Sequence, residues 1–176
     1  MLRPCGTQHD TIQIIFLIFI SGFQDDRSDF LSKEQTLTID LTSKFGRKVK
    51  RHLKQEYIVW LTTAGSDLSP QPRPVWFIWE DTSFLIFSQA HAHKVQHITA
   101  RPYVALHFNT DATGDQDVIV FVGKAVVDAT APPAHKVRAY FRKYRAGIQE
   151  LGMTSEQFSD EYSVAIRVTP TSLRGW

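Results

Sequence analysis

The spacing of apolar residues first follows a helix and then follows a series of strands. Between residues 41 and 53 an apolar side chain recurs at every fourth position, which places these side chains on one face of a helix. The recurring residues are Leu41, Phe45, Val49 and Leu53. We expect Asp40 or Thr42 to cap this helix, because a side-chain oxygen there accepts hydrogen bonds from free amide groups.

Beyond residue 56 the pattern becomes that of β-strands. Runs rich in β-branched and aromatic residues alternate with short turn sequences. These runs cover residues 57–63, 71–80, 83–88, 103–109, 118–129 and 162–168. Pro72 and Pro74 lack the amide hydrogen that a ladder needs, so the first half of the second run is expected at a sheet edge. Gly123 marks an expected bulge in the fifth run.

Three further helices are expected between the strands. Residues 91–100 form a short helix that ends before Pro102, because the residue before a proline avoids the helical conformation. A second helix opens at Pro132-Pro133. Thr154 and Gln157 have the spacing of a capping box for a third. The apolar stripe of the second helix consists of Val137, Tyr140, Phe141 and Tyr144.

Strands in close succession with short links indicate a mainly β protein, a six-stranded antiparallel barrel with flanking helices. Closing the sheet removes the exposed edges of such short strands. A doubly wound parallel sheet is not favoured, since no glycine-rich motif joins a strand to a helix.

The chain contains 176 residues, 43% of them hydrophobic and 22% charged, which fits one globular domain. We place this domain at residues 38–176 and interpret residues 1–37 as a poorly ordered extension or a mis-assigned start. The apolar run from Ile12 to Ile20 is shorter than the ~20 residues of a bilayer-spanning helix, and its flanks do not fit a signal peptide. A membrane anchor is the less favoured alternative.

Charge and composition exclude several classes of function. A net charge of +2 does not by itself indicate nucleic-acid binding, and the basic helices are interpreted as solvated faces. The single cysteine excludes an internal disulfide and fits a reducing compartment. His91, His93 and His97 have no cysteine or carboxylate near them in the sequence, so no metal site is expected. We therefore expect a cytoplasmic protein with no nucleic-acid or membrane partner.

The chemistry concentrates between residues 70 and 101. Ser88 ends a strand, and Lys94 follows near the start of the next helix. A hydroxyl, free backbone amides and an ammonium group together can bind a phosphate. Arg73 could add a second, bidentate contact. The sequence thus predicts a phosphate anchor beside a strand that contains two prolines.

The residues RPVWFIW, followed by SFLIFSQAHAHKVQHITARPYVALHF, resemble the FMN- and coenzyme F420-binding split-barrel superfamily, which is pyridoxamine 5′-phosphate oxidase-like. The resemblance covers roughly residues 38–176. It is closest to the branch of F420-dependent oxidoreductases, because Arg174-Gly175-Trp176 is similar to a terminal motif of that branch.

The resemblance implies a split barrel that binds its cofactor between two subunits of a homodimer. The implied cofactor is deazaflavin, coenzyme F420, with FMN as the alternative. The implied activity is hydride transfer to a small organic substrate; an FMN oxidase or reductase and a non-catalytic cofactor carrier remain open. The cofactor-binding positions that it implies are Arg73, Pro74, Val75, Trp76, Ser88, Gln89, Lys94, Gln116 and Trp176. No catalytic residue is assigned.

Overall fold

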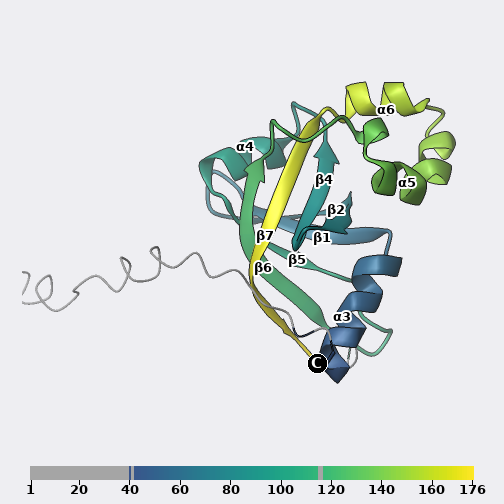
Figure 1. The fold of residues 1–176 in the computed structure, drawn as a ribbon. Coiled ribbons are helices and arrows are strands. Elements are labelled where there is room, and N and C mark those ends of the chain that lie inside the picture. The colour runs from purple at the N-terminus through teal and green to yellow at the C-terminus, as the bar shows by residue number, and fades with distance from the viewer. Residues whose placement is uncertain (1–39, 41, 115–116) are drawn as a thin grey trace, which may run out of the picture. The chain divides into compact units, whose positions relative to one another are not determined.

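The computed structural model describes residues 40, 42–114 and 117–176 (Figure 1). The expectations for residues 1–37, Leu41 and Gln116 lie outside these described residues. None of the described helices is both long and apolar enough to cross a bilayer.

The described part of the chain forms one antiparallel sheet with strand order β2-β1-β5-β6-β7-β4-β3. The strands are β1 (Ile58–Ala64), β2 (Pro70–Trp76), β3 (Ile78–Glu80), β4 (Ser83–Ser88), β5 (Tyr103–His107), β6 (Ile119–Val127) and β7 (Val164–Gly175). Seven strands replace the expected six because the run from residue 71 to residue 80 breaks at Phe77. Its halves, β2 and β3, occupy the two ends of the strand order. One bent segment therefore joins both edges of the sheet and curves it into a split barrel.

Two sequence expectations for the sheet are confirmed. β2 lies at an edge, where Pro72 is opposite Thr62 of β1 and needs no partner on its other side. The pairing of β6 with β7 shifts register between Val122 and Gly123, which is the expected bulge. A Cβ atom at Gly123 would lie 2.5 Å from the carbonyl oxygen of Thr169, so the close approach of the two strands requires glycine.

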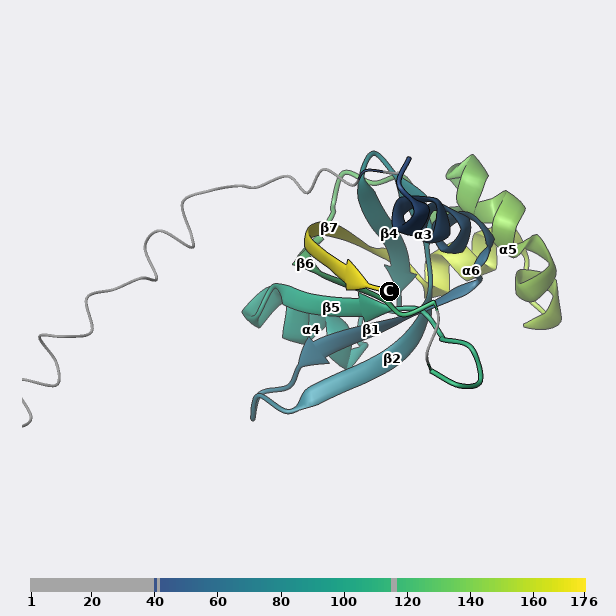
Figure 2. The same ribbon diagram turned by 90° about the horizontal axis from the view of Figure 1, so that it is seen from below.

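The helices flank the sheet. They are α3 (Lys44–Gln55), α4 (His93–Ala100), α5 (Arg138–Glu150) and α6 (Ser155–Glu161), with a short 3₁₀ turn, η1 (Ala134–Lys136). In both views α5 and α6 lie together, on the side of the sheet away from α4 (Figures 1 and 2).

The helix starts correct two expectations and confirm a third. Neither Asp40 nor Thr42 caps α3; the cap is Ser43, whose hydroxyl accepts a hydrogen bond from the amide of Gly46 at 2.9 Å. The Asp40 carboxylate accepts hydrogen bonds from the amide and the hydroxyl of Thr42 instead. The two prolines open η1 rather than α5, because the backbone of Val137 is extended and α5 begins only at Arg138. The capping box of Thr154 with Gln157 is present in α6.

The core has two parts. The larger part fills the barrel and contains Val49 and Leu53 of α3, which confirms the expected buried face of this helix. The smaller part lies between the sheet and the α5–α6 pair and contains Tyr140 and Tyr144. Two polar residues of the expected anchor, Ser88 and Lys94, lie where β4 ends and α4 begins.

Candidate functional site

Ser88 and Lys94 meet at the end of β4. Ser88 is the last residue of this strand and is buried, while Lys94 lies in the first turn of α4 and is half-buried. The Lys94 ammonium donates a hydrogen bond to the Ser88 hydroxyl at 3.2 Å. Burial lowers the pKa of Lys94, and the charge of Arg73 lowers it further. The two cations are therefore close enough to repel each other.

Arg73 reaches this place from β2. It lies directly opposite Leu61 of β1, whose side chain is buried in the barrel. Because side chains alternate between the two faces along a strand and opposite residues share a face, the side chain of Arg73 is directed toward the inner side of the sheet. Its guanidinium is exposed and donates to the carbonyl oxygen of Pro72 at 3.0 Å. Within the described residues, no carboxylate forms an ion pair with Arg73 or Lys94.

Two neighbouring cations without an acidic partner are unfavourable unless an anion binds them. The arrangement offers two positive charges, one hydroxyl and the free amide groups at the start of α4. Phosphate fits this donor set, because it accepts charge-assisted hydrogen bonds from both cations. Arg73, Ser88 and Lys94 therefore form the candidate anchor.

The residues that follow Arg73 on β2 lie in different places. Pro74 is exposed on the outer face, opposite Trp60, and Val75 is buried inside the barrel. The indole of Trp76 stacks on Tyr144 with ring centroids 4.6 Å apart and packs near Phe158. The side chain of Trp76 is therefore part of the core beneath α5.

Two other expected site residues are not brought to the anchor. The amide nitrogen of Gln89 donates to the Glu161 carboxylate at 2.6 Å, which ties the end of β4 to α6. Trp176 follows Gly175, the last residue of β7. Ser88 pairs with Val164, which is the first residue of the same strand. Twelve residues of strand separate these ends, roughly 35 Å at ~3.3 Å per residue. A contact of Trp176 with the anchor would need a second subunit.

The sequence interpretation missed a second polar cluster, which centres on Lys143. This residue was grouped with the solvated cations of its helix, yet its ammonium lies 3.8 Å from the centre of the Phe77 ring and donates to the Phe77 carbonyl oxygen at 3.0 Å. Burial lowers its pKa to about 8, although nearby Glu56 opposes the shift. The sequence contained one indication that Lys143 is partly buried. It lies three residues after Tyr140 and next to Tyr144, and both tyrosines belong to the buried stripe of the helix.

An antiparallel barrel in which one bent strand joins both sheet edges defines the chain as a split-barrel protein. Residues 45–176 match the model of the pyridoxamine 5′-phosphate oxidase family, and the chain belongs to this family. No curated protein matches the sequence.

Solved structures share the fold at low sequence identity. A conserved hypothetical protein from Mycobacterium tuberculosis is 17% identical, with a TM-score of 0.62, and the match covers 82% of this chain and 88% of that chain. An F420 reductase is 21% identical, with a TM-score of 0.51 and coverage of 71% and 94%. The haem storage protein HutZ from Vibrio cholerae is 12% identical, with a TM-score of 0.52 and coverage of 73% and 92%. At these identities the likeness concerns the fold alone.

Proposed function

We propose that the protein is an oxidoreductase that binds reduced deazaflavin, coenzyme F420, and supports hydride transfer to a small organic substrate. The observation that carries the proposal is the pair of uncompensated cations, Arg73 and Lys94, beside the Ser88 hydroxyl. The family is named for a flavin-type oxidase and one structural neighbour is an F420 reductase, which supports a redox cofactor with a phosphate. FMN is the alternative cofactor, because the anchor would contact only the phosphate and would not distinguish the two ring systems.

The chain contributes binding and orientation, and the cofactor supplies the hydride chemistry. Lys94 and Arg73 would bind the phosphate through charge, and Ser88 would orient it through a hydrogen bond. The Ser88–Lys94 contact holds the ammonium in place before a ligand arrives, which reduces the entropy lost on binding. A non-catalytic carrier would use the same anchor.

Titration of the purified protein with F420, FMN and riboflavin tests this proposal. Riboflavin has the flavin ring but no phosphate, so it should bind much more weakly than FMN. Lys94→Ala should weaken the preferred phosphate-bearing cofactor by ~1.5–3 kcal/mol, roughly 10- to 150-fold. The control is Lys124→Ala, which removes an exposed lysine of β6. Unchanged affinity in Lys94→Ala would refute the anchor, and failure to bind either cofactor would refute the function.

The proposed site lies between two copies of the chain, as the family resemblance implies. Support comes from the outer face of the sheet, where the rings of Trp60 and His107 lie nearly parallel with centroids 6.2 Å apart. Val120 and Val122 continue this surface on β6. An apolar sheet face of this kind favours burial against a second copy. Val122→Asp should shift the molecular mass in solution from dimer to monomer, while Ala139→Asp, which adds the same charge at an exposed position of α5, should not.

A further inference from the structure

The exposed side of α3 is entirely basic or uncharged. Its exposed cations are Lys44, Arg47, Lys50, Arg51 and Lys54, and they are called the basic face below. The helix contains no acidic residue. Its apolar residues Val49 and Leu53 are buried in the barrel core, so α3 presents charge to its surroundings and has no apolar side left to insert elsewhere.

Most of this charge is not neutralised within the described part of the chain. The Asp117 carboxylate binds Arg51 at 3.0 Å and the neighbouring Lys48 at 3.1 Å, and the hydrogen bond from Lys48 lowers the pKa of Asp117. The other four cations of the basic face form no ion pair with any described residue. Three of them line a shallow groove together with Arg51; they are Arg47, Lys50 and Lys54. An acidic surface would complement this face.

An exposed aromatic residue lies beside the basic face. The ammonium of Lys48 donates to the carbonyl oxygen of Trp176 at 3.4 Å, and the Trp176 amide donates to Val118 at 3.2 Å. These contacts hold the last residue against α3, as the C-terminal label shows in Figure 1, while 67% of its side chain stays exposed. Tryptophan is favoured where water meets a bilayer, because its ring is apolar and its N–H is polar.

We propose that the basic face and Trp176 dock the protein on an anionic lipid surface, as a peripheral contact that spans nothing. Cations near an anionic bilayer each add ~1 kcal/mol of attraction, roughly fivefold in affinity, and charge alone binds weakly without an apolar element. Trp176 is one such element. Its exposed indole favours a lipid surface over a soluble polyanion, because a soluble polyanion has no apolar region into which the ring could insert.

This inference does not rest on the proposed oxidoreductase function. The sequence-based expectation of no membrane partner came from the shortness of the apolar run, which bears on spanning and not on surface attachment. The proposal gives Trp176 a role in lipid docking, which differs from the cofactor contact that the family resemblance implied.

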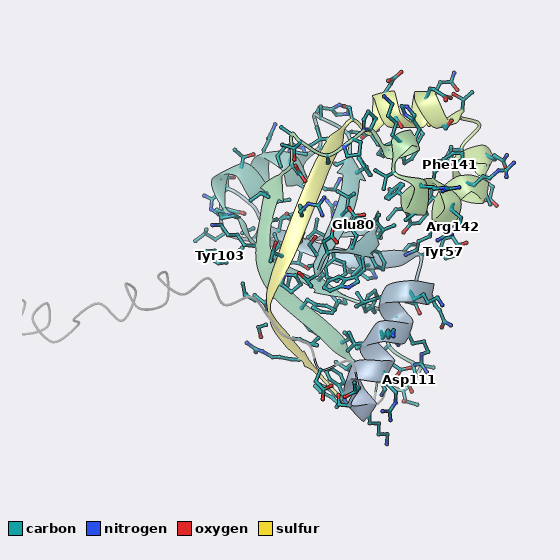
Figure 3. All side chains as sticks on the ribbon, viewed as in Figure 1. Tyr57, Glu80, Tyr103, Asp111, Phe141 and Arg142 are labelled. Atoms are coloured by element: carbon teal, nitrogen blue, oxygen red, sulfur yellow. The ribbon has the colours of Figure 1, made fainter. Side chains whose placement is uncertain are left out.

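Co-sedimentation of the full chain with vesicles tests the docking. Vesicles of phosphatidylcholine with about one third phosphatidylglycerol should bind the protein, pure phosphatidylcholine should not, and ~0.5 M salt should release it. The double variant Lys50→Glu with Lys54→Glu should lower binding at least tenfold. Arg142→Glu with Arg145→Glu on α5 makes the same change in charge at another exposed site and should have little effect (Figure 3 labels Arg142).

Other outcomes overturn the proposal. Absence of binding to the anionic vesicles, or equal weakening by both double variants, would show that no specific face docks. Displacement by decaglutamate or by a single-stranded oligonucleotide at matched charge would identify a soluble polyanion as the occupant. Trp176→Ala should weaken vesicle binding; equal binding by this variant and the wild type would show that the indole takes no part in docking.

Discussion

The hydroxyl oxygen of Tyr144 lies 2.7 Å from both the backbone nitrogen and the backbone oxygen of Phe77. It accepts from the Phe77 amide and can donate to the carbonyl oxygen of Phe77 or, at 2.8 Å, to that of Tyr57. Phe77 is the fully buried residue at which β2 turns into β3, so its backbone groups have no place in either ladder. One side chain of α5 thus satisfies the bend that joins the two edges of the sheet.

Removal of this hydroxyl should destabilise the fold. In Tyr144→Phe the buried amide of Phe77 loses its acceptor, and an unsatisfied buried donor costs ~1–3 kcal/mol. Chemical denaturation of the variant and the wild type measures the loss. Tyr162→Phe is the matched control, because Tyr162 stacks on Phe158 and its hydroxyl makes no hydrogen bond among the described residues. Equal losses in both variants would contradict the role given to the Tyr144 hydroxyl.

This bend explains why the strand count differed from the sequence expectation. The residues around Phe77 are apolar and aromatic on both sides, without a glycine or a turn motif, and they have the local pattern of one continuous strand. The break depends on a hydrogen bond with the hydroxyl of Tyr144, which lies on α5, 67 residues later in the chain. Local patterns correctly predicted the edge position of β2, the bulge at Gly123 and the capping box of α6, because each of these features depends on a few adjacent residues.

The packing of Trp76 makes a second prediction about the fold. Its indole lies between the α5–α6 pair and β2, stacked on Tyr144 at 4.6 Å, and a Cβ atom on Gly147 would approach it to 2.8 Å. Trp76→Ala should therefore cost ~3–5 kcal/mol of unfolding free energy, the range typical of a large aromatic lost from a core. Trp60→Ala, on the outer face of the sheet, should cost the monomer less. A loss below 1 kcal/mol for Trp76→Ala would show that the indole contributes little to the core.

The candidate site was predictable only where it is local. Ser88 and Lys94 lie six residues apart across one turn, so the sequence alone indicated that they meet. Arg73 was an additional possibility, and its place beside Lys94 depends on the curvature of the sheet. The position of Trp76 follows from tertiary packing, which the alternation of a strand does not reveal. The cluster at Lys143 was missed for the same reason.

Lys143 should make stability depend on pH above neutrality. Its pKa in the folded chain is about 8, below the ordinary 10.5 of an unfolded lysine. Between these values the folded state has lost the proton that the unfolded state keeps, so the unfolding free energy rises with pH. From pH 7 to pH 9.5 the wild type should gain stability relative to Lys143→Met. The exposed Lys136→Met is the control and should follow the wild type. Parallel curves for the wild type and Lys143→Met would show that burial does not perturb this amine.

The charge of Lys94 should make cofactor affinity depend on pH. Burial, and then the charge of Arg73, hold the pKa of Lys94 below that of an ordinary lysine. As pH rises through this lowered value the ammonium loses its proton and its attraction for phosphate, so FMN or F420 should bind less tightly at pH 9.5 than at pH 7. Lys94→Arg keeps its charge over this range and should lose less affinity. Cofactor fluorescence measures both curves, with riboflavin as a control for titration of the flavin ring. If the wild type and Lys94→Arg lose affinity in parallel, Lys94 is not the group that holds the phosphate.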